Sequence, residues 1–111
     1  MEHKSYAEAK AVCIWHGKKL VEPKSTQANN LTTQLAQSQG INRFWIGVND
    51  FANEGIFVYD SSGETIVYEN WNSGEPNNFG SGEDCIEIRD GGYWNDNFCT
   101  KKFPFVCENL H

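Results

Sequence analysis

Residues 83–99 read Glu-Asp-Cys-Ile-Glu-Ile-Arg-Asp-Gly-Gly-Tyr-Trp-Asn-Asp-Asn-Phe-Cys. Hydrophobic and polar residues alternate from Cys85 to Arg89, which predicts a β-strand. Asp90-Gly91-Gly92 predicts a tight turn that leads directly into Tyr93-Trp94. The stretch therefore predicts a turn between short strands, rich in acids, with a cysteine at or near each end.

The net charge of the protein is concentrated in and just before this stretch. The 111 residues carry a formal charge of −6, and residues 70–97 alone hold six acidic residues and one basic residue. Acidic groups so close together repel one another unless something neutralises them. A solvated acidic loop would fit the composition, but the sharper interpretation is a cation site.

Composition and length exclude several classes of protein. No run approaches the roughly 18 apolar residues of a membrane-spanning helix. The start, Met1-Glu2-His3-Lys4, lacks the apolar region of a signal peptide. A sequence pI of 4.9 argues against a nucleic-acid binder, which would need a basic face. The length predicts a single domain over residues 1–111.

The cysteines are Cys13, Cys85, Cys99 and Cys107, and no two form a C-x-x-C pair, so a structural zinc site is not expected. An even number of cysteines in a small domain predicts two disulfides and an oxidising, extracellular compartment. Four cysteines allow three pairings, and the sequence alone selects none of them.

Two helices are predicted in the first part of the chain. The stretch Ser5-Tyr6-Ala7-Glu8 fits a capping box, and the apolar spacing that follows predicts a helix over about 6–16, ended by Gly17. Its inward face is expected to comprise Tyr6, Ala9 and Cys13. A second helix is capped by Ser25 or Thr26 and ended by Gly40. Its expected inward residues are Ala28, Leu31 and Leu35.

Short strands follow the two helices. Phe44, Ile46 and Val48 alternate with their neighbours, residues 56–59 and 65–68 flank the turn residues 60–64 as a hairpin, and residues 103–108 predict a closing strand. Helices followed by antiparallel strands predict an α+β fold. No periodicity appears between Asn70 and Gly82, and a long irregular stretch in a small domain is usually functional or disordered.

Three clusters of oxygen-bearing side chains lie in the acidic region: Glu75-Pro76-Asn77, Glu83-Asp84-Cys85 and Trp94-Asn95-Asp96. Carboxylate and amide oxygens are the ligands that Ca²⁺ prefers, and the clusters offer no soft ligand for zinc or copper beyond the cysteines expected in disulfides. The spacing is not that of an EF-hand. These clusters therefore predict a calcium site of another kind.

With these motifs in place, the sequence resembles a C-type lectin-like domain over nearly its whole length. Trp45-Ile46-Gly47-Val48 is similar to the W-I-G-L signature of the family, and the four cysteines and the three clusters follow with family-like spacing. The resemblance implies the C-type lectin-like fold, with a long calcium-binding loop region. It also implies the disulfides Cys13–Cys107 and Cys85–Cys99 and a cis peptide bond before Pro76.

The resemblance further implies the residues of the binding site. The principal Ca²⁺ would be bound by five residues: Glu75, Asn77, Glu83, Asn95 and Asp96. An auxiliary Ca²⁺ would be bound by Asp50, Glu54, Asn78, Glu83 and Asp84. Asn78 departs from the Asp expected there, so a weaker second ion is predicted. Sugar would contact the five principal ligands and Phe79.

The resemblance implies a secreted, extracellular lectin of innate immunity that binds glycans and is not an enzyme. The E-P-N motif implies sugars with vicinal equatorial 3- and 4-hydroxyls, namely mannose, glucose and N-acetylglucosamine, with fucose in a related geometry. One alternative is a lectin-like domain that binds protein, mineral or ice surfaces. A hydrolase using Glu83 and Asp96 is disfavoured, because no histidine or nucleophile elbow accompanies the acids.

The sequence departs from the family at its start. The family usually has a strand before the first helix, paired to the closing strand, whereas only five residues precede Tyr6 here. The first strand is therefore expected to be reduced or absent, and residues 103–108 are expected to form an exposed edge. An exposed edge can pair with a second chain, which makes a homo-oligomer an expected partner arrangement.

Overall fold

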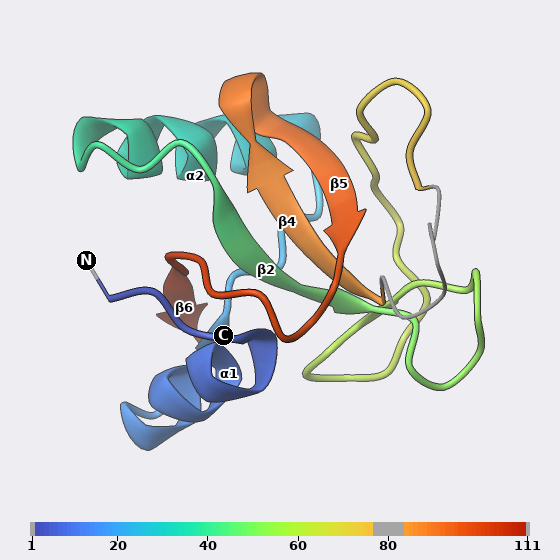
Figure 1. Ribbon diagram of the computed structural model, residues 1–111. Helices are drawn as coiled ribbons and strands as arrows, with labels where there is room; N and C mark the ends of the chain where they lie inside the picture. The colour runs from blue at the N-terminus through green and yellow to red at the C-terminus, as the bar shows by residue number, and fades with distance from the viewer. Residues whose placement is uncertain (1, 77–83, 111) are drawn as a thin grey trace.

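The structure is a computed structural model that describes residues 2–76 and 84–110. Figure 1 shows a helix on either side of a small central sheet, with a long irregular region at one end of the sheet. The elements follow in the order α1 (Tyr6–Trp15), β1 (Lys18–Leu20), α2 (Thr26–Ser38), β2 (Phe44–Asn49), β3 (Val58–Tyr59), β4 (Cys85–Arg89), the 3₁₀ turn Asp90–Gly92, β5 (Tyr93–Asn97) and β6 (Cys107–Asn109). The predicted α+β class is confirmed.

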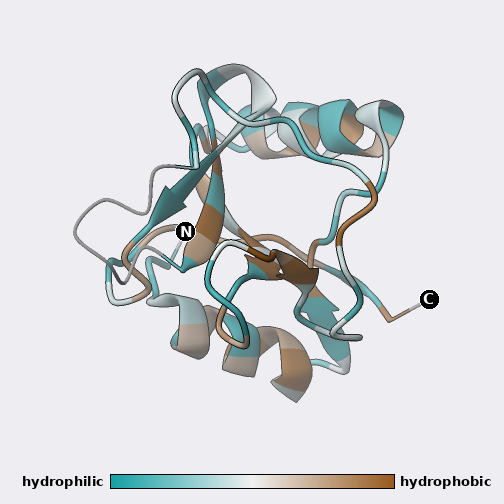
Figure 2. Ribbon diagram, turned by 90° about the vertical axis from the view of Figure 1, so that its right-hand side faces the viewer, coloured by the Kyte–Doolittle hydropathy of each residue, from teal (hydrophilic) through white to brown (hydrophobic). Residues whose placement is uncertain are grey.

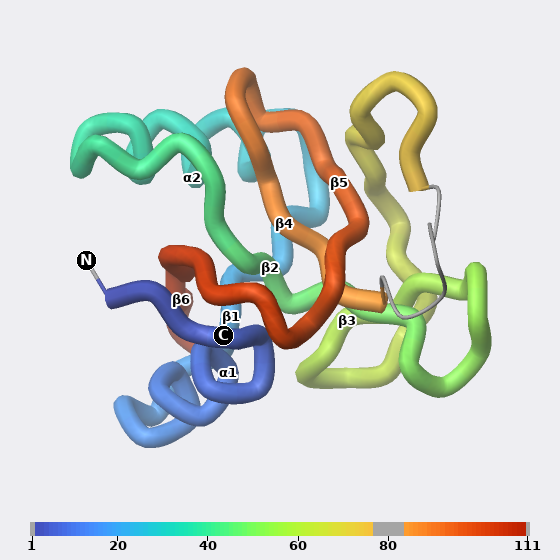
Figure 3. The backbone as a smooth tube through the Cα atoms, viewed as in Figure 1, coloured from blue at the N-terminus to red at the C-terminus, as the bar shows by residue number. Residues whose placement is uncertain are grey.

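The strands form two antiparallel sheets. The central sheet has the order β3-β2-β4-β5, and a second sheet pairs β1 with β6. The backbone tube in Figure 3 shows β2, β4 and β5 running side by side between the helices, while β1 and β6 lie near α1. The predicted turn at Asp90-Gly91-Gly92 joins β4 to β5 in full register, from Arg89 opposite Tyr93 to Cys85 opposite Asn97.

Helix α1 begins as the sequence predicts. The Ser5 side chain accepts from the backbone N–H of Glu8, and the Glu8 carboxylate accepts from the backbone N–H of Ser5, so both halves of the capping box are present. The predicted inward residues Tyr6, Ala9 and Cys13 are buried. Gly17 follows the helix with a φ of +71°, a conformation that glycine adopts without steric cost.

Helix α2 has the predicted Ser25 cap, but its predicted inward face is wrong. Leu31 and Leu35 are 58% and 60% exposed, and the buried residues are Asn29, Thr33 and Ala36. Polar side chains are buried here because each has a hydrogen-bond partner. Asn29 donates to the carbonyl of Gly92 and accepts from the Trp94 indole N–H, and the Thr33 hydroxyl donates to the carbonyl of Asn29.

Hydrophobic residues fill both sides of the central sheet. All six residues of β2 are buried, with Phe44, Ile46 and Val48 in the cluster that includes α2 and Trp94, and Trp45 in the cluster that includes α1. In Figure 2 the hydrophobic segments gather on strands between the two helices. Burial on both faces explains why the strand carries no polar side chain before Asn49.

Both disulfides implied by the family resemblance are confirmed. Cys13 is bonded to Cys107, and Cys85 is bonded to Cys99. The first bond joins α1 to β6, and the second joins the start of β4 to the segment after β5. Cross-links of this kind stabilise a small domain mainly by restricting its unfolded chain.

The closing segment differs from the predicted strand over residues 103–108. Only Cys107–Asn109 form β6, which pairs with β1, a strand that the sequence did not predict. Phe103 forms one antiparallel bridge with Lys4, so the expected reduced first strand amounts to that single bridge among the described residues. The closing segment is therefore paired at both ends, with Lys4 and with β1, while β6 has β1 as its one partner strand among the described residues and remains an edge strand.

The predicted hairpin over residues 56–68 is present in a short form. Val58–Tyr59 form β3, and Val58 makes one bridge with Thr65 across the turn. Buried Glu22 holds this turn, because its carboxylate accepts from both the backbone N–H and the hydroxyl of Ser61. Within residues 2–76 and 84–110, neither helix has the length and apolar character needed to cross a membrane.

Candidate functional site

Sheet register brings two of the predicted acids together. Asn49, the last residue of β2, pairs with Cys85, the first residue of β4. Asp50 follows one strand and Asp84 precedes the other, so both lie at the same end of the sheet. A backbone hydrogen bond of 3.2 Å from the Asp50 N–H to the Asp84 carbonyl fixes this proximity. The antiparallel pairing of strands far apart in sequence therefore builds one side of the site.

Glu54 completes a group of three carboxylates with Asp50 and Asp84. One oxygen from each lies within 4.8 Å of the others. Asp50 is only 3% exposed, Asp84 is partly buried and Glu54 is exposed. Oδ1 of Asp50 and Oδ1 of Asp84 are both buried and have no hydrogen-bond partner among the described residues. Buried carboxylate oxygens without a donor are costly, so this arrangement suits a bound cation.

The electrostatics of this group agree with its geometry. The pKa of Asp50 is raised to about 7, mainly by burial and also by the nearby carboxylates of Glu54 and Asp84, while the hydrogen bond from the Gly55 N–H opposes the shift. That hydrogen bond to Asp50 Oδ2 is 2.7 Å long. Without a cation the charged form of Asp50 is therefore disfavoured, and a divalent ion would reverse that preference.

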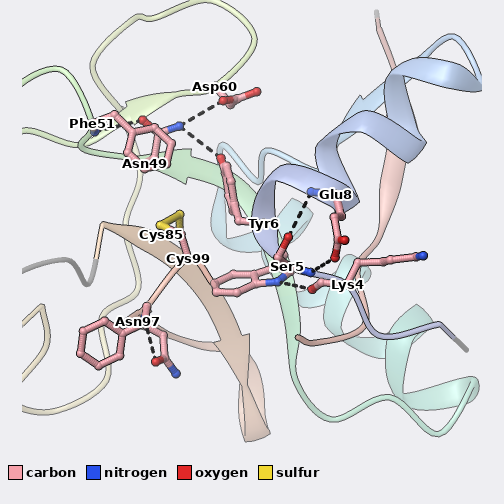
Figure 4. The surroundings of a disulfide bond; sticks show 12 residues. Lys4, Ser5, Tyr6, Glu8, Asn49, Phe51, Asp60, Cys85, Asn97 and Cys99 are labelled. Carbon is pink, nitrogen blue, oxygen red and sulfur yellow. Dashed lines mark hydrogen bonds between the residues drawn. A yellow bond between two sulfur atoms is a disulfide. The ribbon is translucent and has the colours of Figure 1, made fainter. Parts of the chain in front are cut away.

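A polar network holds the start of the loop that carries Asp50. The Asn49 amide donates to the Tyr6 hydroxyl at 3.2 Å and to the Asp60 carboxylate at 3.1 Å, while its oxygen accepts from the Phe51 N–H. Figure 4 shows this network beside the Cys85–Cys99 disulfide. Burial raises the pKa of Tyr6, so its hydroxyl stays protonated. The loop is thereby anchored to α1 and to the hairpin.

A second part of the site forms where the chain before Pro76 runs along β5. Trp71 forms a parallel bridge with Trp94, with backbone hydrogen bonds of 2.8 Å from Asn72 N–H to the Trp94 carbonyl and from Trp94 N–H to the Asn70 carbonyl. The two indole rings meet edge to face, 5.6 Å apart. This pairing places the segment that contains Glu75 alongside the segment that contains Asn95 and Asp96.

The described members of the predicted principal set differ in burial. Glu75 is partly buried, whereas Asn95 and Asp96 are 7% and 1% exposed. The peptide bond between Glu75 and Pro76 is cis, as the resemblance implies. The remaining predicted residues, Asn77, Asn78, Phe79 and Glu83, lie outside the described residues.

The sequence analysis missed a buried ion pair beside Asn95. Glu87 is fully buried in β4, and its carboxylate accepts two hydrogen bonds of 2.8 Å from the guanidinium of Arg43. It also accepts from the side-chain amides of Asn95 and Asn97. In the sequence, Glu87 is one of the six acidic residues between positions 70 and 97 and has no other distinguishing motif. Its place between Ile86 and Ile88, in a strand with apolar residues on both faces, is the signal that could have revealed it.

The sequence and the fold both match a known protein family. A family model described as the lectin C-type domain matches residues 2–109. Among curated proteins, Collectin-10 of Gallus gallus is 40% identical over 109 residues, which are 98% of this chain and 39% of that protein. The chain thus spans well under half the length of this relative.

Solved structures agree with the sequence matches. The carbohydrate-recognition domain of the mouse scavenger receptor C-type lectin superposes with a TM-score of 0.88 at 30% identity, over 96% of this chain and 83% of that one. The carbohydrate-recognition domain of cow CD23, solved in the presence of a GlcNAc2Man3 oligosaccharide, gives a TM-score of 0.88 at 32% identity, over 98% and 82% of the two chains. These likenesses confirm the predicted fold.

Proposed function

Because this chain belongs to the C-type lectin domain family, we propose that it binds mannose-type sugars through calcium. Family membership supports carbohydrate binding by a C-type lectin domain, and it supports the prediction that the chain is not an enzyme. Family membership does not by itself determine which sugars bind or whether Ca²⁺ takes part. Both parts of the proposal rest on the E-P-N motif and on the arrangement of oxygen ligands at the end of the sheet.

The observation that carries the proposal is the pairing of Trp71 with Trp94. This pairing runs the segment that leads to Glu75 and Pro76 along the strand that contains Asn95 and Asp96. Glu75, Asn95 and Asp96 are three of the five residues proposed for the principal ion. Asn77 and Glu83 complete the set by their positions in the motifs. The five side chains would supply three carboxylates and two amides, a donor set that fits Ca²⁺.

The carboxylates of Asp50, Glu54 and Asp84 support a second ion. Their oxygens approach one another within 4.8 Å, and the buried Oδ1 atoms of Asp50 and Asp84 have no donor among the described residues. Glu83 and Asn78 are proposed to contribute as well. Because Asn78 is neutral, this second ion should bind more weakly than one held by an additional carboxylate.

The side chains of the principal set would also orient the sugar. When bound, Ca²⁺ supplies a coordination sphere large enough for two sugar hydroxyls besides the protein oxygens. Glu75 and Glu83 would accept hydrogen bonds from those hydroxyls. The amides of Asn77 and Asn95 would donate hydrogen bonds to the same hydroxyls. The bonds accepted by the two glutamates would be the stronger ones, because a carboxylate is charged. Phe79 is proposed to pack on the apolar face of the sugar ring.

A single site of this kind should bind weakly, with a dissociation constant on the order of millimolar. Useful avidity would then come from several domains that engage one glycan surface together. We therefore propose a secreted protein that recognises cell-surface or microbial glycans and presents more than one copy of this domain. The matched region is 39% of the length of Collectin-10 of Gallus gallus, so that relative extends well beyond this domain.

Retention on immobilised mannose tests the proposal. The protein should bind in calcium and elute with EDTA or free mannose. E75Q should abolish retention, because it removes a carboxylate proposed to hold both the ion and a hydroxyl. E64Q is the matched control, since Glu64 is an exposed residue of the hairpin turn and loses the same charge. Retention that persists in EDTA, or no retention in calcium, would refute calcium-dependent mannose binding and favour another surface as ligand.

The double variant E75Q/N77D tests which residues select the sugar. It converts the E-P-N motif to the Q-P-D form, which the family resemblance associates with galactose. Preference should move from mannose toward galactose in competition elution, with the number of bound calcium ions unchanged. An unaltered order of competing sugars would show that Glu75 and Asn77 do not determine selectivity.

A further inference from the structure

The buried carboxylate of Glu87 lies directly opposite Asn95 in the register of β4 and β5. Its Oε1 accepts from Arg43 Nε at 2.8 Å. Its Oε2 accepts from the Arg43 guanidinium at 2.8 Å, from Asn97 Nδ2 at 2.7 Å and from Asn95 Nδ2 at 3.2 Å. Four donors thus converge on one fully buried group, and one of them belongs to a proposed calcium ligand.

Arg43 fixes the charge and the position of this carboxylate. Two parallel hydrogen bonds from a guanidinium hold a carboxylate in one plane and keep it ionised. The guanidinium is itself held from the other side, because it stacks 4.1 Å from the centre of the Phe103 ring. An ionised carboxylate has acceptors and no donor. Any side chain that faces Glu87 must therefore present a donor to it.

This requirement decides which way the Asn95 amide faces. Its Nδ2 points at Glu87 Oε2, so its carbonyl oxygen is directed away from the carboxylate. The reverse orientation would set the amide oxygen against a negative charge in a buried place, where such a contact is costly. Only the carbonyl oxygen of an amide can coordinate Ca²⁺, so Glu87 leaves Asn95 in the one orientation that a cation can use.

We propose that Glu87, held by Arg43, is a positioning residue for the calcium site and acts by orienting the Asn95 amide. The inference rests on the proposed function, because it assumes that Asn95 is a ligand of the ion. Outer partners that orient a metal ligand typically change metal affinity by about 10–100-fold when they are altered. The second hydrogen of Nδ2 is not used by Glu87, so the amide can still donate to a sugar hydroxyl.

The variant E87Q tests this role, because the glutamine keeps the size of the side chain and loses its charge. Its amide must turn a donor toward either Arg43 or the two asparagines, so the Asn95 orientation is no longer enforced. Calcium affinity, measured by titration calorimetry, should fall about 10-fold or more. E64Q should bind calcium within about twofold of the unaltered protein, since distant sites act independently.

The double variant E87Q/N95D separates positioning from general damage to the fold. Alone, N95D should weaken calcium binding although it adds a negative charge, because two carboxylates would then face each other. In the double variant the glutamine can donate to the new carboxylate, so donor and acceptor are exchanged. The double variant should therefore bind calcium at least about fivefold more tightly than the product of the two single losses predicts.

A spectroscopic readout covers the case in which E87Q does not fold. R43K keeps a cation beside Glu87 but removes the two parallel hydrogen bonds. In the calcium-free protein, the Asn95 side-chain amide signals should show a hydrogen-bonded, slowly exchanging proton, and R43K should speed that exchange. The proposal is overturned if the signals do not change in R43K or if E87Q binds calcium as tightly as the unaltered protein. An unaltered protein that binds no calcium instead overturns the proposed function.

Discussion

Two groups of acids lie at different points along β4, one in the middle of the strand and one at its start, and they are neutralised differently. In the middle of β4, Glu87 is paired with Arg43 and accepts from two asparagine amides. At the start of the same strand, Asp84 joins Asp50 and Glu54, and the buried Oδ1 atoms of the two aspartates have no donor among the described residues. The first group carries its own cation, whereas the second offers oxygens to a cation from outside.

This difference separates a carboxylate that is neutralised within the fold from carboxylates that we propose to bind a cation. A buried ion pair contributes little net stability, but removing one partner leaves an uncompensated charge. A cluster of carboxylates without a cation destabilises the protein until a metal binds. Net charge alone could not distinguish the two groups, because Glu87 and Asp84 count equally in the composition. Variants that change one group at a time distinguish them.

The largest effect is expected from R43M. It leaves the Glu87 carboxylate buried without its cation, which should cost about 3–5 kcal/mol of unfolding free energy. Urea denaturation with and without calcium would measure this loss, which should be present in both conditions. K10M is the control, because Lys10 pairs with Asp60 at 3.1 Å with a side chain that is 42% exposed. The unfolding free energy of K10M should fall by less than about 1 kcal/mol. If R43M lost no more than K10M, Glu87 would not depend on Arg43 for its neutralisation.

D50N should have the opposite sign in the calcium-free protein. The neutral amide removes a buried charge that no described cation compensates, so the unfolding free energy at pH 7.5 should rise by about 1–3 kcal/mol. The same variant should lose much of the stabilisation that calcium gives. D60N is the matched control and should destabilise, because Asp60 accepts from Lys10 and Asn49. A fall in stability in calcium-free D50N would show that Asp50 is a structural residue only.

Asp50 should also make the calcium-free protein less stable as the pH rises. Burial raises its pKa from 3.8 to about 7, so between those values the folded protein keeps a proton that the unfolded chain has lost. Stability from this group therefore falls as the pH increases through that window. Calcium affinity should change in the opposite direction, because the ligand must be deprotonated. Thermal unfolding between pH 5 and pH 7.5 in EDTA, compared with D50N, would reveal the trend in stability, and calcium titrations over the same pH range without EDTA would reveal the trend in affinity. Identical slopes for D50N and the unaltered protein would contradict the assignment.

The smallest effect is expected from E54Q. Glu54 is exposed, so the calcium-free protein should change in stability by less than about 0.5 kcal/mol. Calcium binding at the proposed second site should nonetheless weaken, because one of its four proposed carboxylates is lost. Calorimetric titration alongside a urea unfolding curve would separate the two effects. An affinity equal to that of the unaltered protein would remove Glu54 from the ligand set.

The sequence predicted the elements that local signals define. The capping box of α1, the turn at Asp90-Gly91-Gly92 and the strand from Cys85 to Arg89 depend on neighbouring residues, and all three are confirmed. The inward face of α2 was predicted wrongly. Apolar spacing favoured Leu31 and Leu35, whereas hydrogen bonds to Gly92 and Trp94 bury Asn29 instead.

Contacts between residues far apart in the chain could not be predicted from the sequence. Glu22 binds Ser61 and Arg43 binds Glu87, and no local pattern indicates either pair. The resemblance provided the disulfides and the cis bond before Pro76, which are confirmed. It also provided the ligand sets, of which the structure brings together Asp50, Glu54 and Asp84, while the assignment of the ligands stays a prediction.

Calcium titration of the metal-free protein tests whether these carboxylates bind a cation. We expect saturable binding by calorimetry, with dissociation constants on the order of 10⁻⁴–10⁻³ M, the range of extracellular calcium modules. D50N should bind fewer ions or bind them more weakly, while E64Q should match the unaltered protein. No calcium binding up to about 10 mM, well above that affinity range, would contradict a calcium site at this end of the sheet.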